Sequence, residues 1–73
     1  MARSLTPNQS RQLSERELEV LNLLVEGRSN PEIAAALYLS PNTVKTHVKS
    51  IMNKFGVNDR VQTAVFALRN GFV

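Results

Sequence analysis

The sequence predicts a single all-α domain, a four-helix bundle that includes a helix-turn-helix. Four segments repeat apolar residues at helical spacing, and most of them lie between a capping residue and a glycine. We find no alternating strand pattern and no internal repeat. With 73 residues the core can give only marginal stability. We expect residues 13–73 to form the domain and the polar residues 1–12 to be a flexible lead-in or linker stub.

The first helix has a clear start. Ser14 is a good N-cap, and Glu17 three residues later completes a capping box. Gly27 ends the segment. Carboxylates in the first turns complement the helix dipole, so they need no catalytic role. The expected inner stripe is Leu18, Leu21, Leu24 and Val25, with Leu13 and Leu18 as a hydrophobic staple.

The second helix follows with Asn30 as the expected cap and Pro31 at the first position. Ile33, Ala34 and Leu37 repeat at helical spacing. Only Leu39 separates Tyr38 from the next cap, so the two helices must cross steeply, as in a helix-turn-helix. The connection lacks the glycine often found there, which leaves the shape of the turn open.

The third helix is expected from the cap Ser40 to Gly56, with Pro41 at its first position. Its inner stripe comprises Val44, Val48, Ile51 and Phe55. The opposite side has amides, a hydroxyl and two lysines but no carboxylate: Asn42, Lys45, Thr46, Lys49 and Asn53. This side suits a polyanion, although the solvated face of an ordinary amphipathic helix would also fit.

The last helix is expected from about Asp59 to Asn70, capped by Asn58 or Asp59 and ended by Gly71. Its predicted inner stripe is Val61, Ala64, Val65 and Leu68, extended by Phe72. A second stripe comprises Thr63, Phe66, Ala67 and Asn70, and we expect two copies to associate through it about a two-fold axis. The alternative is that Phe66 folds back over its own domain.

Composition excludes several classes of function. There is no cysteine and only one histidine, so transition-metal and histidine-based catalytic sites lack ligands. We therefore expect no enzyme activity and no cofactor. No apolar run approaches the roughly 20 residues of a membrane span, and no signal-peptide core is visible. We expect a cytoplasmic protein without a membrane partner.

Charge is distributed unevenly along the chain. The net charge is only +3, but five of the six acidic residues lie at or before Glu32. From Ile33 to Asn58 there is no acid, whereas all three lysines fall there. Such a local basic field favours phosphate backbones or anionic surfaces.

Several spaced motifs together resemble the LuxR-type helix-turn-helix domain, also called FixJ/NarL or GerE-like. Phe55 stands where that family usually has leucine, and Pro31 and Pro41 are variants in the first helical turn. The resemblance extends from Leu13 to about Gly71. It is carried by residues 13–21, 27–34, 43–48 and 54–57 together with Ser40, Ile51, Arg60 and Ala64.

The resemblance implies a bacterial transcription regulator, as in two-component systems, whose third helix reads promoter DNA. Members usually dimerise through the C-terminal helix, and a contact with RNA polymerase is a further expectation. The residues expected at bases are Asn42, Lys45, Thr46 and Lys49. Those expected near phosphates are Asn30, Ser40, Thr43, His47 and Lys54. Thr43 and His47 could instead be half-buried at the core edge, and Arg60 could pair locally.

Two other functions remain open from sequence alone. The last helix-turn-helix of a sigma factor shares the Glu-Arg-Glu opening and the Glu-Ile-Ala run, but the long helix after Gly56 favours the LuxR type. The second function is that of a protein-interaction adaptor with the same bundle. The absence of carboxylates on the exposed side of the third helix counts against it, because an adaptor has no reason to exclude them there. The sequence also fits either a stand-alone small regulator or the output domain of a longer response regulator.

Overall fold

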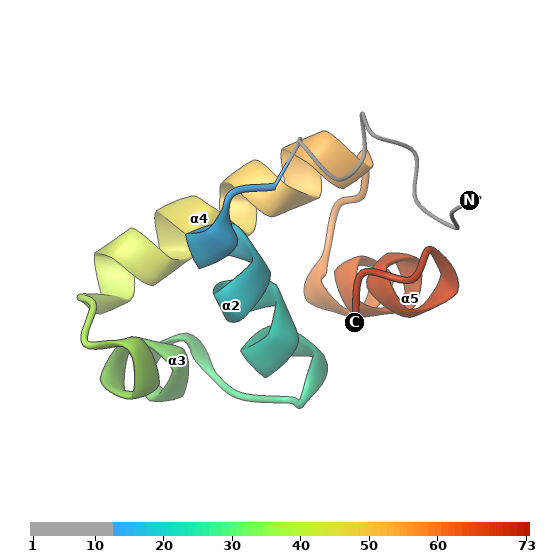
Figure 1. Cartoon of the computed structure of the whole chain (residues 1–73). Helices are drawn as coiled ribbons and strands as arrows, with labels where there is room; N and C mark the ends of the chain where they lie inside the picture. The colour runs from blue at the N-terminus through green and yellow to red at the C-terminus, as the bar shows by residue number, and fades with distance from the viewer. Residues whose placement is uncertain (1–12) are drawn as a thin grey trace.

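The structure, a computed structural model, describes residues 13–73 and has four α-helices in that range. They are α2 (Glu15–Val25), α3 (Asn30–Leu37), α4 (Pro41–Phe55) and α5 (Arg60–Arg69) (Figure 1). The described residues contain no strand, which confirms the all-α prediction. The predicted lead-in, residues 1–12, lies outside the described residues.

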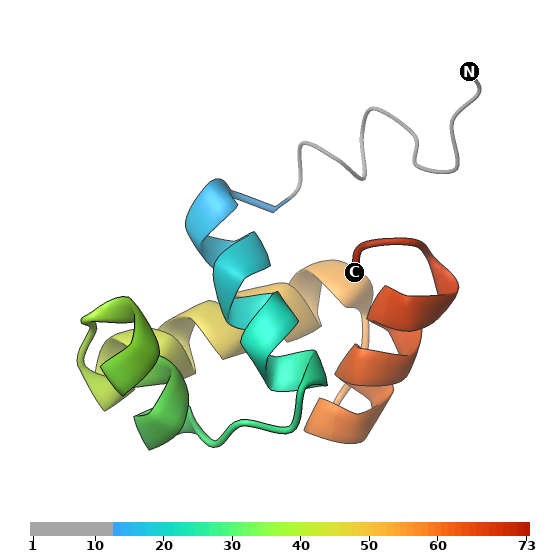
Figure 2. The same ribbon diagram turned by 60° about the horizontal axis from the view of Figure 1, so that its bottom comes forward.

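The longest helix, α4, organises the arrangement. Helix α2 crosses it, and α3 and α5 lie on either side of α2 (Figure 2). Both α2 and α4 contact all three other helices. None of the helices in residues 13–73 is long and apolar enough to cross a membrane.

The predicted ends of α2 and α4 are confirmed. Ser14 Oγ accepts a hydrogen bond from the Glu17 backbone at 3.1 Å, and Glu17 Oε1 accepts one from the Ser14 backbone at 3.0 Å. Ser40 Oγ likewise caps α4 by accepting from the Thr43 backbone at 3.1 Å. Gly56 ends α4 with φ 72°, a conformation that glycine adopts without steric cost.

Helix α3 has a different cap from the one expected. Ser29 Oγ accepts from the Glu32 backbone at 3.3 Å, and Glu32 Oε1 accepts from the Ser29 backbone at 2.9 Å. Asn30, the expected cap, is the first helical residue. The Ser-x-x-Glu capping box at residues 29–32 was present in the sequence and decides the position. Asp59 is the cap of α5, accepting from the Gln62 backbone at 2.8 Å.

The core forms where the apolar stripes of the helices meet. The predicted stripe of α4 is confirmed, since all four of its residues are buried. Helix α2 contributes Val20 as well, which the prediction omitted and which is fully buried. The buried apolar residues are Leu13, Val20, Leu21, Leu24, Ile33, Ala34, Val44, Val48, Ile51, Phe55 and Ala67.

The expected orientation of α5 is wrong. Thr63 and Ala67, expected on an exposed second stripe, are 0% exposed. Phe66 stacks on Phe55 with ring centroids 4.3 Å apart, and both rings lie near Phe72. The alternative, that Phe66 folds back over its own domain, is therefore correct. The predicted inner residues Val61, Val65 and Leu68 are instead 73%, 40% and 59% exposed, whereas Ala64 is half-buried.

Polar residues of α5 can face inward because the helix backbone satisfies them. The Thr63 hydroxyl donates to the Asp59 carbonyl at 2.7 Å, and Asn70 Nδ2 donates to the Phe66 carbonyl at 2.9 Å. Among residues 13–73 no buried side-chain nitrogen or oxygen lacks a hydrogen-bond partner, so the aromatic contacts can decide the rotation of the helix.

A buried carboxylate connects α2 to the C-terminal half of α4. Glu17 is only 6% exposed. Besides the Ser14 backbone, it accepts from Lys54 Nζ at 2.9 Å and from Ser50 Oγ at 2.8 Å. Burial alone raises the pKa of Glu17, but the hydrogen bonds from Lys54, Ser14 and Ser50 outweigh it and lower the pKa from its ordinary value of 4.5.

This lowered pKa predicts an acid-dependent contribution to stability. A carboxyl whose pKa is lower in the folded state stabilises the fold at higher pH and loses that contribution as pH falls through the folded pKa. We expect Glu17→Gln to lower the melting temperature at pH 7 and the difference from the parent to shrink below about pH 4.5. Glu19→Gln, on the exposed side of α2, is the matched control. A melting difference that stays constant from pH 7 to pH 3 would contradict this role of Glu17.

The turn between α3 and α4 has an unusual residue at its left-handed position. Tyr38 has φ 59° and ψ 42° and is 95% exposed. The Leu39 backbone donates to the Ala34 carbonyl at 2.9 Å, which closes the end of α3. A non-glycine residue in this conformation costs about 1–2 kcal/mol. The glycine missing from the sequence motif is thus replaced by a strained tyrosine.

Tyr38→Gly should raise the free energy of unfolding by about 1 kcal/mol, because the strain is removed and almost no buried surface is lost. Ala36→Gly is the control: it is exposed on the same helix with ordinary helical geometry and should destabilise by a similar amount. Thermal or urea unfolding measures both. Destabilisation by Tyr38→Gly would contradict the assignment of backbone strain to this position.

Candidate nucleic-acid interface

Burial of the apolar stripe of α4 exposes the opposite side of that helix. All four residues expected at bases, Asn42, Lys45, Thr46 and Lys49, are exposed there. The Thr46 hydroxyl donates to the Asn42 carbonyl at 3.1 Å within the same helix. The predicted exposed side of the helix is confirmed; contact with bases stays a prediction.

The chemistry of this exposed side is dominated by hydrogen-bond donors. Within residues 13–73 neither Lys45 nor Lys49 forms an ion pair. Ammonium groups can donate to guanine O6 and N7, and an amide such as that of Asn42 can pair with adenine. An α-helix fits the major groove of duplex DNA, so these groups could reach base edges together.

Some of the residues expected near phosphates lie beside this surface. Ser40 and Thr43 are exposed at the start of α4, and their hydroxyl oxygens are 2.9 Å apart. Ser40 Oγ is also engaged as the helix cap. His47 is half-buried, in line with the core-edge alternative, whereas Thr43 is not.

The structure places Lys54 apart from this group. It lies 14 residues beyond Ser40 on the same helix, which corresponds to about 20 Å. Its ammonium group is 2.9 Å from Glu17 Oε1, so the carboxylate offsets its charge. A structural role in holding α2 against α4 accounts for this lysine.

Asn30, the remaining residue expected near a phosphate, contacts a partner that the sequence pattern did not indicate. Its side-chain Oδ1 accepts a hydrogen bond of 2.7 Å from Arg60 at the start of α5. Arg60 also donates to the Arg28 carbonyl at 2.8 Å. Local pairing of Arg60 was one of the alternatives, but its partners are an amide and a carbonyl rather than a carboxylate.

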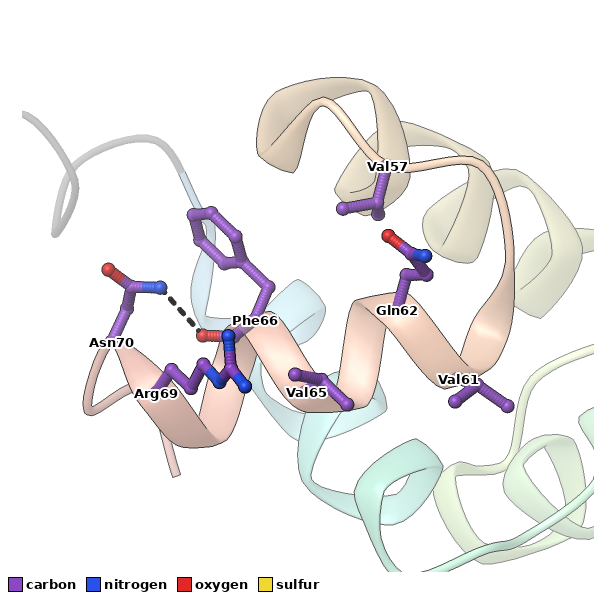
Figure 3. Close-up of a pocket in the computed structure, with 7 residues that line it drawn as sticks. All are labelled: Val57, Val61, Gln62, Val65, Phe66, Arg69 and Asn70. Carbon is purple, nitrogen blue, oxygen red and sulfur yellow. Dashed lines mark hydrogen bonds between the residues drawn. The ribbon is translucent and has the colours of Figure 1, made fainter.

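A second surface feature lies on the outward side of α5. Val61 and Val65 separate two open hollows of about 430 and 320 Å³. Figure 3 shows the larger hollow, with Phe66 lying on one side of it and the two valines on another. The helical spacing of this stripe was visible in the sequence, but we had predicted that it faces the core. Its residues are Val61, Val65 and Leu68, which we call the valine-leucine stripe.

These features define a helix-turn-helix domain with a basic exposed helix. Residues 11–67 match the family described as bacterial regulatory proteins, luxR family. The chain therefore belongs to the LuxR family, and the resemblance noted in the sequence is confirmed.

Curated relatives agree with this family. Over 61 residues the chain is 49% identical to the transcriptional regulatory protein LiaR of Bacillus subtilis, covering 84% of this chain and 29% of LiaR. It is 51% identical to the transcriptional regulatory protein DegU of Brevibacillus brevis, covering 84% of this chain and 26% of DegU. The response regulator protein VraR of Staphylococcus aureus is 44% identical, with 84% of this chain and 29% of VraR covered. The chain thus spans less than a third of the length of these relatives.

The fold is also similar to a solved structure. The crystal structure of the response regulator ChrA in a heme-sensing two-component system superposes with a TM-score of 0.82 at 34% sequence identity. The match covers 94% of this chain and 40% of the ChrA chain.

Proposed function

We propose that this chain is a DNA-binding domain of a transcription regulator and that α4 lies in the major groove of promoter DNA. One observation carries the proposal: α4 buries its apolar stripe and exposes a side with no carboxylate and with two lysines that form no ion pair within residues 13–73. A surface of this kind attracts the phosphate backbone and offers donors to base edges. The names of LiaR, DegU and VraR, which are transcriptional or response regulators, support the same class of function.

The proposed contacts follow from position on the fold. Asn42, Lys45, Thr46 and Lys49 would face bases, and Ser40, Thr43, His47 and Asn30 would lie near phosphates. We leave Lys54 out of this proposal because its ammonium lies 2.9 Å from Glu17 Oε1. The domain would then affect transcription by occupying a promoter or by contacting RNA polymerase there.

The proposal predicts strongly salt-dependent binding to which Lys49 contributes. The probes are a duplex selected from a random pool by the parent chain and a scrambled duplex of equal length. We expect a steep fall of affinity with salt for both duplexes. Lys49→Ala should weaken binding to the selected duplex by about 1–3 kcal/mol if Lys49 contacts a base, and should reduce discrimination between the two.

Arg16→Ala is the control, because it removes one exposed positive charge from α2 instead of α4, a charge that is paired with Glu19. Circular dichroism melts verify that both variants remain folded. Absence of detectable binding by the parent at low salt would favour the adaptor alternative. Equal effects of the two substitutions would show that α4 has no special role.

We further propose that two copies associate on DNA through the valine-leucine stripe of α5. The stripe is exposed and apolar, and the two hollows beside it could accept the corresponding ridge of a second copy. A two-fold axis would pair the same surface with itself. This arrangement replaces the interface first expected at Thr63, Phe66, Ala67 and Asn70, of which Thr63 and Ala67 have no exposed surface.

One helix side buries little area, so association should be weak in free solution and appear mainly as cooperative binding. Two recognition helices about 34 Å apart would read successive major grooves. The pairing would thus link two half-sites without a strong dimer in solution.

Leu68→Glu should leave the fold and single half-site binding nearly unchanged but abolish cooperative binding to two half-sites, because a carboxylate would be buried against apolar side chains. Asn22→Glu, an exposed position on α2, adds the same charge elsewhere. Gel-shift titrations on one-site and two-site duplexes measure the effect. Undiminished cooperativity in Leu68→Glu would remove this stripe as the interface.

A further inference from the structure

Arg60 connects the start of α5, next to the stripe proposed for pairing, to Asn30, which is proposed to lie near a phosphate. It is the first residue of α5 and precedes Val61 of the valine-leucine stripe. Its guanidinium reaches the first residue of α3 and the loop before it, with Nη1 on Asn30 Oδ1 at 2.7 Å and Nη2 on the Arg28 carbonyl at 2.8 Å. In Figure 2 this loop passes close to the start of α5.

This contact fixes the orientation of the Asn30 amide. A guanidinium has only donors, so the oxygen of the Asn30 amide must face Arg60. The Nδ2 group is thereby directed to the other side, and it donates no hydrogen bond to another side chain or backbone group in residues 13–73. The exposed end of Asn30 is thus a donor, which is the polarity that a phosphate oxygen requires.

The neighbouring acids do not compete for this donor. Glu32 accepts from the Ser29 backbone at 2.9 Å, and Asp59 accepts from the Gln62 backbone at 2.8 Å. Glu26 lies 3.5 Å from Arg28 Nε. None of these carboxylates accepts a hydrogen bond from Asn30 Nδ2 within residues 13–73, which leaves the amide available to an external acceptor.

We propose that Arg60 is a positioning residue for DNA binding: it holds Asn30 with its NH2 group outward, where it donates to a backbone phosphate. This inference rests on the proposed function. It adds Arg60 of α5 to the residues that support DNA binding, through its contact with Asn30 of α3. In this scheme Arg60 makes no phosphate contact itself: its Nη1 and Nη2 groups donate to Asn30 and to the Arg28 carbonyl within the domain.

A double-mutant cycle on the full chain tests the proposal. The variants are Arg60→Met, Asn30→Ala and the double variant, and the probe is a scrambled-sequence duplex, because phosphate contacts are independent of sequence. Each single change should weaken binding about 3- to 10-fold, the range for one hydrogen bond. The double variant should bind no more weakly than Asn30→Ala alone.

Salt dependence separates positioning from direct contact. Arg60→Met should retain the parent's slope of log affinity against log salt, whereas loss of a direct phosphate contact would reduce that slope by about 0.9. The side-chain amide signals of Asn30 in a ¹⁵N NMR spectrum should shift on addition of the duplex in the parent but not in Arg60→Met. Arg60→Lys, which keeps the charge without the fork, replaces Arg60→Met if the latter unfolds.

Additive losses in the cycle, or a slope reduced by about one unit in Arg60→Met, would overturn the proposal. So would Asn30 amide signals that respond to DNA equally with and without Arg60. Failure of the proposed function looks different, because the parent chain itself would then show no salt-dependent binding to either duplex.

Discussion

Burial of the apolar side of α4 is the constraint on which the other features depend. Val44 and Ile51 have no exposed surface, and the helices α2, α3 and α5 all pack against α4. A helix held from three directions cannot rotate about its axis without opening the core. The exposed positions of α4 are therefore determined by the residues on its hidden side. The polar side chains are free to vary in chemistry while their direction stays fixed.

The carboxylates of Glu17, Glu32 and Asp59 form no ion pair with Lys45 or Lys49 within residues 13–73, because each is engaged at another position in the domain. Glu17 is bound to Lys54 and Ser50 inside the domain, and the carboxylates of Glu32 and Asp59 accept from backbone N–H groups at helix starts. Such positions also suit a negative charge, because the N-terminus of a helix is positive. The modest net charge thus understates the field on one side of the molecule.

Local signals made most of the fold predictable, and distant contacts account for what was missed. The ends of α4 followed from Ser40 and Gly56, and its buried side from a single apolar stripe. Helix α5 has two stripes of similar character, and the choice depended on the aromatic cluster around Phe55 and on the internally bonded Thr63 hydroxyl. No spacing rule reports those contacts. The exposed side of α4 was predictable because it lies opposite the apolar stripe. The contacts Arg60–Asn30 and Lys54–Glu17 join residues 30 and 37 positions apart, so no local pattern indicated them.

The aromatic cluster at the joint between α4 and α5 has a mechanical consequence. Phe55 is the last residue of α4, and its ring contacts Phe66 of α5 and Phe72 beyond the end of α5. The connection between the two helices is only four residues long, 56–59. A helix of 15 residues is about 22 Å long, so a rotation of roughly 10° at this joint moves its far end by about 4 Å. That displacement is close to the rise of one base pair, about 3.4 Å. The stiffness of three packed phenyl rings would therefore determine how strictly a pair of these domains measures the distance between two binding sites.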